Sequence, residues 1–408
     1  MQLVETGTVT SPQGFKAAGV AAGIKPRGRP DLAIILSDAP AVFAGAFTDH
    51  ALPAAAVRYD RELFGRAETV RAIVVNSGNA NSCTGAQGMT DTLEMAAHTA
   101  EQTGIASDAV IVSSTGVIGV PLPMDRIRGG ITAAAAALAA DGGSDAAVAI
   151  MTTDTVPKSL AATVDIDGVP VTIGGIAKGA GMIAPKLIGP MRHATMLAYM
   201  TTDAAIAADL LQSTLEASLD ESFNRITVDG DRSTNDTFIA LANGMAANQP
   251  IQAGSAAASA FQHAFNAVAA ELARMIVRDG EGATRFVQVR VAGAASRGEA
   301  KRGAHAIANS MLCKTAWFGG DPNWGRILDT VGYAGIAVDP DGIDMDFDDV
   351  AVVRGGVAAG TPQGVLDTAV SAAEFRIDID LGVGRGAYTV WTCDLSCDYV
   401  NINAEHHT

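Results

Sequence analysis

The feature that most constrains the fold is an alternation of apolar and other residues on both sides of an Asp-Gly pair. Residues 161–175 read AATVDIDGVPVTIGG, with Asp167 and Gly168 at the centre. Asp-Gly favours a two-residue turn, and alternation on both sides predicts two antiparallel strands. A second alternating stretch, EFRIDIDLGVGRGAYTVWTCDLS (374–396), also predicts a hairpin around a glycine-rich turn. The apolar residues on one face of its first strand are Phe375, Ile377, Ile379 and Leu381.

Long helical patterns separate these strands. Short apolar runs predict further strands at 31–37, 41–48, 71–78 and 109–116. Helical spacing predicts helices at 88–102, at 123–143 with a glycine stop, and at about 256–278. Hairpins mixed with long helices favour the α+β class, with helices packed on largely antiparallel sheets. No repeat, charge run or linker marks a domain boundary.

Composition excludes several classes of function. The 48% hydrophobic content and 44 glycines in 408 residues are typical of a globular enzyme. The net charge of −16 argues against nucleic-acid binding, because phosphate contacts need a basic surface. Residues 1–16 lack the pattern of a secretory signal, and the tract ITAAAAALAA is too short to span a membrane. We therefore expect a cytoplasmic protein without membrane or nucleic-acid partners.

Common catalytic motifs are absent. The sequence contains no G-x-S-x-G elbow and no phosphate-binding G-x-x-x-x-G-K-[ST] loop, and GVGRG (382–386) falls in a predicted hairpin turn. Its histidines show no H-x-x-x-H or Cys/His cluster, so we expect no metal site. The cysteines are expected to be reduced; they are Cys83, Cys313, Cys393 and Cys397.

Stretches rich in small polar residues remain, and each could be only a turn. Site residues accumulate in loops, so several such stretches in one chain favour a catalytic function. They are NSGNANSCTG (76–85), SSTGVIG (113–119), MTTDTVPK (151–158), the Gly/Pro-rich loop from Lys178 to Thr195, FNRITVDGDRSTNDT (223–237) and DPNWGRI (321–327).

These stretches occur in an order that resembles a known family. Further matching runs are PQGFKAAGVAAGIK (12–25), DGEGATR (279–285) and CDYVNINAEHHT (397–408). Over nearly its whole length the chain resembles the ornithine acetyltransferases, the bifunctional glutamate N-acetyltransferases of arginine biosynthesis. The resemblance implies a layered architecture similar to that of the N-terminal-nucleophile hydrolases.

The resemblance implies self-cleavage between Ala194 and Thr195. The cut would leave fragments 1–194 and 195–408, and Thr195 would become an N-terminal nucleophile. Its hydroxyl would attack the preceding carbonyl, and its freed α-amine, with a pKa of about 8, could then act as the base. We expect Thr195 to carry acetyl from N2-acetyl-L-ornithine to L-glutamate.

The other site residues are carried over by position. Thr115 and the Gly116 backbone N–H match the family's oxyanion donors, and Thr152, Lys178 and Thr195 match substrate contacts. Glu281 matches a residue that holds a substrate ammonium. Asn403 and Thr408 match the last two contacts. Alone, each could have a structural role: the threonines could close turns, Lys178 could be a solvated charge, and Glu281 could end a helix.

One departure falls just before the predicted cut. KLIGPMRH (186–193) stands between Pro185 and Ala194, about six residues more than the family pattern leads us to expect. Loop-closure entropy grows slowly with length, so the cut could proceed unchanged. Alternatively, a displacement of about 1 Å at the scissile carbonyl could slow it about a hundredfold. His193 in this insert could assist as a base or be incidental.

Other functions stay open at this point. One is an amidase or aminopeptidase on the same fold, another is an uncleaved non-catalytic paralogue, and a third is a related acyltransferase of secondary metabolism. The resemblance implies no cofactor, although acetyl-CoA could serve as a co-substrate. It also implies a heterotetramer of two cleaved pairs.

Overall fold

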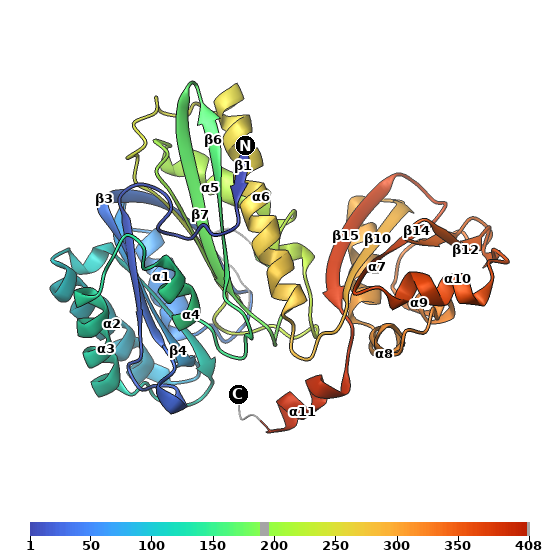
Figure 1. Ribbon diagram of the computed structural model, residues 1–408, viewed down its shortest axis with the longest axis horizontal. Coiled ribbons are helices and arrows are strands. Elements are labelled where there is room, and N and C mark those ends of the chain that lie inside the picture. The colour runs from blue at the N-terminus through green and yellow to red at the C-terminus, as the bar shows by residue number, and fades with distance from the viewer. Residues whose placement is uncertain (188–195, 406–408) are drawn as a thin grey trace. The chain divides into compact units, whose positions relative to one another are not determined.

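The computed structural model describes residues 1–187 and 196–405, which form two compact units (Figure 1). The first contains Met1–Asn224 and Arg232–Ile276, and the second contains Arg225–Asp231 and the described residues from Val277 to Glu405. The fragments 1–194 and 195–408 stay a prediction about cleavage, and the strands on either side of residues 188–195 belong to one sheet.

Within the described residues, the first unit is built on a nine-stranded sheet. Its strands are β1 (Gln2–Val4), β2 (Phe15–Val20), β3 (Leu32–Phe47), β4 (Val70–Asn79), β5 (Val110–Val117), β6 (Lys158–Ile166), β7 (Val169–Lys178), β8 (Leu197–Thr202) and β9 (Thr237–Ala242). The order is β1-β6-β7-β8-β9-β3-β4-β5, and β2 also pairs with β3. Only the β4–β5 and β8–β9 pairs are parallel among the described strands of this sheet. The hairpin predicted at Asp167-Gly168 is confirmed as β6–β7.

The long strand β3 joins the two halves of this sheet. Its first half pairs with β2 and β4, and its second half pairs with β9. The sequence predicts two strands here, at 31–37 and 41–48, and that separation is wrong. The β3–β4 register shifts between Leu36 and Ala41, so the intervening residues make the pairing irregular without ending the strand.

Helices accompany the sheet in the first unit (Figure 1). They are α1 (Ala55–Phe64), α2 (Gly85–Thr103), α3 (Met124–Ala136), α4 (Gly143–Ala149), α5 (Ala208–Leu219) and α6 (Ala256–Arg278), with short 3-10 turns η1 (Pro26–Gly28), η2 (Ser107–Ala109) and η3 (Phe223–Arg225). The predictions for α2 and α6 are confirmed. The helix predicted at 123–143 is too long: α3 ends at Ala136 because Ala139 pairs with Ala17 of β2.

One apolar cluster of the first unit contains residues from both halves of the sheet. Buried side chains of β8 and β9, among them Tyr199, Ile239 and Leu241, belong to the same apolar cluster as those of β3, β4 and β5. Such a continuous core fixes the strand ends, and the candidate residues of this unit lie at or near those ends.

The second unit has a six-stranded sheet among the described residues, in the order β13-β12-β11-β14-β10-β15. Its strands are β10 (Phe286–Ala294), β11 (Asp344–Phe347), β12 (Val350–Arg354), β13 (Val357–Ala358), β14 (Glu374–Asp380) and β15 (Gly386–Cys393). Its helices are α7 (Arg297–Asn309), α8 (Met311–Gly319), α9 (Trp324–Tyr333), α10 (Gln363–Ser371) and α11 (Cys397–Glu405).

The hairpin predicted at 374–396 is wrong, although both of its strands exist. β10 lies between β14 and β15, parallel to the first and antiparallel to the second. The four apolar residues predicted to share a face of the first strand are all buried. Alternation therefore identified the strands and the buried face but not the neighbour of each strand.

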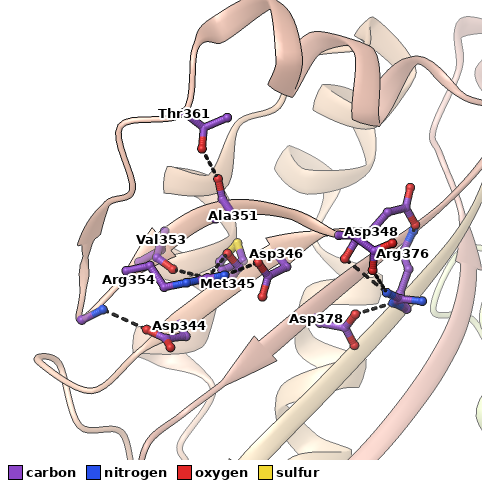
Figure 2. A network of polar contacts seen from close by, with 12 residues as sticks. Asp344, Met345, Asp346, Asp348, Ala351, Val353, Arg354, Thr361, Arg376 and Asp378 are labelled. Carbon is purple, nitrogen blue, oxygen red and sulfur yellow. Dashed lines mark hydrogen bonds and ion pairs between the residues drawn. The ribbon is translucent and has the colours of Figure 1, made fainter.

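Charged side chains line part of this sheet, as Figure 2 shows. Arg376 contacts Asp378, and its backbone N–H donates to Asp348 Oδ1 at 2.9 Å, while Arg354 Nη2 donates to Asp346 Oδ1 at 2.5 Å. All of these residues except Arg354 border an open hollow whose lining includes Gln288 and Arg290. None of the candidate site residues lines it.

The predicted α+β class with largely antiparallel sheets is confirmed. The four cysteines are free thiols, of which Cys313 and Cys393 are buried. In the part of the chain that the structure describes, no helix combines the length and apolarity needed to cross a membrane.

Candidate active site

The predicted oxyanion donors lie at the end of β5. Thr115 is buried, and Gly116 has a φ of +130°, a backbone region that glycine tolerates and other residues rarely adopt. A Cβ on Gly116 would lie 2.4 Å from the carbonyl carbon of Gly78 and 2.5 Å from Asn79 N. The β4–β5 register also shifts at Gly78–Asn79. The close approach of two strand ends therefore requires glycine at position 116.

The polar stretch 76–85 holds this strand end in place. Ser114 Oγ donates to Asn76 Oδ1 at 2.6 Å, and Asn76 Nδ2 donates to the carbonyl of Asn79 at 2.8 Å. Asn79 Nδ2 in turn reaches the carbonyls of Val120 and Pro121, both at 3.1 Å. The chain before and after Thr115 is thus tied to β4 by buried amide side chains.

Lys178 is the last residue of β7, and its side chain reaches Thr115, one of the predicted oxyanion donors. Its Nζ donates to Thr115 Oγ1 at 3.2 Å, and the side chain is buried. In the sheet register Lys178 lies opposite Leu197, the first residue of β8, and Leu197 lies opposite Thr237, the first residue of β9. The end of β7 and the starts of β8 and β9 therefore form one row.

Asp154 connects Thr152 to Lys178. Its Oδ1 accepts from Lys158 Nζ and from the backbone N–H of Gly179, each at 2.7 Å, and its Oδ2 accepts from Thr152 N–H at 2.9 Å. Burial would raise the pKa of Asp154, but the ammonium groups of Lys158 and Lys178 and these hydrogen bonds lower it to about 2. The carboxylate is therefore ionised and fixes the residue after Lys178.

A third buried ammonium lies close by. Lys25 Nζ donates to the carbonyls of Met151 at 2.6 Å, Pro30 at 2.7 Å and Ala149 at 3.4 Å. Burial and the nearby Arg29, with a smaller effect from Lys178, lower the pKa of Lys25 to about 8. Because it binds the carbonyl that precedes Thr152, Lys25 shapes the loop carrying that residue.

The segment that precedes β9 borders both Thr115 and the start of β8. Asn235 Nδ2 donates to the Ser114 carbonyl at 2.8 Å and to the Ala80 carbonyl at 2.5 Å. The backbone N–H of Thr237 donates to the Met196 carbonyl at 2.7 Å. Between them, Asp236 is buried, and burial raises its pKa well above the usual value, with the Lys178 ammonium offsetting part of this shift.

Two further candidates meet in the second unit. Asn403, on α11, donates from Nδ2 to Glu281 Oε2 at 2.8 Å. Glu281 is buried in the glycine-flanked turn after α6, and Ser396 Oγ donates to the carbonyl of Gly282 at 2.6 Å. A Cβ at Gly282 would lie 2.5 Å from the backbone N of Tyr399, so the turn and the start of α11 are tightly packed.

The structure thus forms two groups of the predicted residues. Thr115, Gly116, Thr152 and Lys178 gather in the first unit, and Glu281 and Asn403 pair in the second. Ala194, Thr195, Thr408 and His193 lie outside the described residues. Of the insert 186–193 only Lys186 and Leu187 are described, and Leu187 exchanges backbone hydrogen bonds with the side chain of Asn224.

The group in the first unit suits acyl chemistry. A threonine hydroxyl and a glycine N–H at a strand end can donate to a developing oxyanion, and a buried ammonium beside them favours negative charge. The same ammonium can hold a carboxylate. Among the described residues no cluster of three His, Cys, Asp or Glu side chains could hold a metal ion.

Sequence reasoning missed residues that complete this group. Asp154 and Lys158 lie in MTTDTVPK, Asn235 and Asp236 lie near the end of FNRITVDGDRSTNDT, and Lys25 ends the first matching run. These stretches were recognised as polar, but their charged and amide residues could not be assigned contacts, because the partners lie far away in sequence.

Comparison with known proteins places the chain in a family. The chain is 51% identical over 397 residues to the arginine biosynthesis bifunctional protein ArgJ of Geobacter sulfurreducens, covering 97% of this chain and 99% of the relative. It is 48% identical over 406 residues to the ArgJ protein of Symbiobacterium thermophilum, covering 98% and 99%.

A solved ArgJ structure from Bacillus halodurans is 40% identical, with a TM-score of 0.51, and covers 52% of this chain and 100% of the solved chain. The model of the ArgJ family matches residues 16–408. On this match and on relatives aligned over nearly their full length, the chain belongs to the ArgJ family.

Proposed function

We propose that this chain is an acetyltransferase of arginine biosynthesis that moves acetyl from N2-acetyl-L-ornithine to L-glutamate through an acetyl-Thr195 enzyme. The observation that carries the proposal is the contact of Lys178 Nζ with Thr115 Oγ1, the residue before Gly116. Lys178 ends β7 and lies opposite Leu197, the first residue of the neighbouring strand β8. Thr195 is two residues before β8 in sequence. An oxyanion site of this kind is what both self-cleavage and acetyl transfer need.

Self-cleavage would proceed through an ester. Thr195 Oγ attacks the carbonyl carbon of Ala194, the C–N bond breaks, and the hydroxyl proton passes to the departing nitrogen. Water then hydrolyses the ester, which restores the hydroxyl, leaves a carboxylate on Ala194 and gives the new α-amine a second proton. Thr115 Oγ1 and Gly116 N–H donate to the oxyanion in both steps.

Acetyl transfer would repeat the chemistry with an external amide. Thr195 Oγ attacks the acetyl carbonyl of acetylornithine, and the α-amine of Thr195 takes its proton and passes it to the leaving ornithine amine. The glutamate amine then attacks the acetyl ester, loses a proton to the same base, and releases N-acetylglutamate. Between the two half-reactions, the acetyl group is therefore held as an ester on Thr195.

Each group of side chains offers its own charged contact to a substrate. Thr152 and Lys178 offer a hydroxyl and an ammonium to a substrate carboxylate, and the Asp154 network keeps both in place. Glu281, supported by Asn403, offers a carboxylate to a substrate ammonium, and Thr408 is proposed as a further substrate contact. An acceptor site for an amino acid favours a transferase over a hydrolase, which needs only water.

One consideration supports the cut. The Bacillus halodurans chain is matched over its full length by about half of this chain, and residues 195–408 also make up about half. The family resemblance further leads us to propose a cytoplasmic heterotetramer of two cleaved pairs.

Denaturing intact mass tests the cut first, followed by an acetylornithine-to-glutamate transfer assay. We expect two fragments that meet at Ala194–Thr195 in the wild type, and one inactive full-length chain in Thr195→Ala. Transfer activity in Thr195→Ala would refute the nucleophile assignment. A single wild-type species would indicate that the 186–193 insert blocks maturation.

A further inference from the structure

The turn that carries Glu281 is held by a residue far away in sequence. Asp394, which is 3% exposed, follows β15 directly. Its Oδ1 accepts from the backbone N–H of Thr284 at 2.8 Å and of Arg285 at 3.0 Å, and its Oδ2 accepts from Thr284 Oγ1 at 2.5 Å. Its own N–H donates to the Arg285 carbonyl at 3.3 Å. This buried carboxylate therefore fixes the end of the 279–285 turn.

Ser396 holds the middle of the same turn. Its Oγ donates to the Gly282 carbonyl at 2.6 Å, and the residue is buried. Gly282 follows Glu281 directly and has a φ of +67°, and a Cβ there would lie 2.7 Å from Ser396 Oγ. The backbone next to Glu281 thus lies against this hydroxyl. We call Asp394 and Ser396 together the clamp.

The same hydroxyl also begins α11, the helix that carries Asn403. Ser396 directly precedes α11, and its Oγ accepts from the Tyr399 N–H at 3.4 Å, as the side chain of a helix N-cap does. None of the residues of α11, all of which the structure describes, is buried, so polar contacts rather than core packing fix this helix. Asn403 Nδ2 donates to Glu281 Oε2 at 2.8 Å and to the Tyr399 carbonyl at 2.9 Å. The clamp therefore positions both members of the Glu281–Asn403 pair.

A buried ammonium fixes the segment that carries the clamp. Lys314 on α8 is 2% exposed, and its Nζ donates to Thr392 Oγ1 at 2.9 Å and to the Cys393 carbonyl. In return, the backbone N–H of Leu395 donates to the Lys314 carbonyl at 3.2 Å. The backbone on either side of Asp394 is thus tied to α8, so the clamp has a fixed base.

These contacts point to a role in substrate binding. We propose that Asp394 and Ser396 are positioning residues of the reaction, which hold the Glu281 carboxylate where it receives the ammonium of an amino-acid substrate. This inference rests on the proposed function, in which Glu281 binds that ammonium. A carboxylate held in its binding position before the substrate arrives avoids the entropy cost of ordering a mobile turn on binding. The clamp acts through Glu281 and Asn403 and is not expected to touch the substrate.

The alternative is that the clamp only stabilises the second unit. Its removal would then lower activity by the same factor whether or not Glu281 is present, because the loss would come from the folded state as a whole. A clamp that acts through Glu281 has no effect on binding once that carboxylate is gone. The two roles therefore differ in how the substitutions combine.

A double-mutant cycle measures this difference. Ser396→Ala removes the donor to the Gly282 carbonyl, and Asp394→Asn leaves one side-chain oxygen for three donors. Each should lower kcat/KM for N2-acetyl-L-ornithine about tenfold, while self-cleavage stays complete. In the Glu281→Ala background each should change kcat/KM by less than about twofold. Equal fold-changes in the two backgrounds would overturn the proposal.

Thr284→Val keeps the proposal testable if the clamp variants do not fold. Thr284 is exposed, and its hydroxyl donates to Asp394 Oδ2, so this variant removes one contact of the clamp without disturbing the core. It should lower kcat/KM for acetylornithine by about threefold when Glu281 is present and leave it unchanged in Glu281→Ala. An unchanged kcat/KM in both backgrounds would count against the clamp.

Ser296→Ala is the matched control for the loss of a helix cap. Ser296 Oγ accepts from the Glu299 N–H at 3.2 Å at the start of α7, in the same unit as the clamp. Among the described residues Ser296 forms no hydrogen bond with the 279–285 turn. Its substitution should leave kcat/KM unchanged. A fall as large as that in Ser396→Ala would show that cap loss alone explains the effect, and the proposal would be wrong.

Failure of the underlying function would look different. If the wild type transfers no acetyl, both proposals fall together. If the wild type is active but Glu281→Ala leaves kcat/KM for acetylornithine unchanged, the role of Glu281 falls and the clamp falls with it. If Glu281→Ala lowers kcat/KM but the clamp variants act equally in both backgrounds, only the role of Asp394 and Ser396 falls.

Discussion

Replacing Asp154 by Asn should destabilise the first unit and weaken substrate binding together. The wild-type carboxylate accepts three hydrogen bonds, from Lys158 Nζ, Gly179 N and Thr152 N, at 2.7, 2.7 and 2.9 Å. Asparagine offers one oxygen and turns its amide N–H₂ toward one of these donors. It also leaves the Lys158 ammonium, which is 1% exposed, without its charge partner.

The magnitude follows from the burial of this pair. Breaking a buried ion pair by removing one partner costs roughly 3–5 kcal/mol. The pKa gives an independent figure: a shift from about 4 in the unfolded chain to about 2 corresponds to roughly 2–3 kcal/mol. The two values agree in order of magnitude. We therefore expect Asp154→Asn to lose about 3 kcal/mol of unfolding free energy at pH 7.

The sign of the pH dependence follows from the lowered pKa. A depressed acid pKa stabilises the fold above the unfolded pKa of about 4, and this stabilisation is lost as the pH falls toward 2. Wild type and Asp154→Asn should therefore converge in stability over that window. Removing both charges, as in Asp154→Asn with Lys158→Met, should recover part of the loss, because no unpaired ammonium remains.

Urea unfolding followed by far-ultraviolet circular dichroism measures these differences at pH 7 and at pH 3. The three tryptophans, Trp317, Trp324 and Trp391, all lie in the second unit, so their fluorescence reports that unit separately. A loss below 1 kcal/mol at pH 7, or a difference that does not shrink on acidification, would refute the assigned ion pair. The transfer assay should show a raised KM for the substrate whose carboxylate Lys178 binds.

Three further substitutions test other parts of the site. Gly116→Ala places a Cβ 2.4 Å from the carbonyl carbon of Gly78, so the rate of self-cleavage should fall by about a hundredfold or more. Intact mass measured over time gives this rate. A wild-type rate would contradict the oxyanion role. Glu281→Ala should raise KM for the amino-acid substrates while self-cleavage stays complete; loss of cleavage would show that its role is misassigned. The pKa of Lys25 is lowered from 10.5 to about 8 in the folded protein, so between these two pH values the unfolded chain binds more protons than the folded one. The free energy of unfolding of the wild type should therefore rise with pH over this range. Lys25→Met should remove this rise in thermal melts, and an unchanged slope would contradict the lowered pKa.

The sequence predicted local features well and distant pairings poorly. The alternation in 374–396 located both strands and the buried face of the first, but β10 lies between them, and no local pattern specifies such an insertion. Residues 31–48 contain Pro40 and read as two strands, yet β3 continues because different partners pair with its two halves. Among the site residues, Lys178 and Thr115 were identified by family order. Asp154 and Asp236 were not, because their importance depends on burial and on contacts across the fold.

The order of strands in the first sheet has a consequence for how the protein can be made. β8 and β9, which follow the proposed cut, lie between β7 and β3, which precede it. The two pieces are therefore interleaved, each supplying hydrogen-bond partners to the interior of the other. Neither could complete this sheet alone, since the first piece would be left with unpaired edges on both β7 and β3. Assembly must precede scission, and a cut molecule that unfolds would have to find a separate partner chain in order to refold.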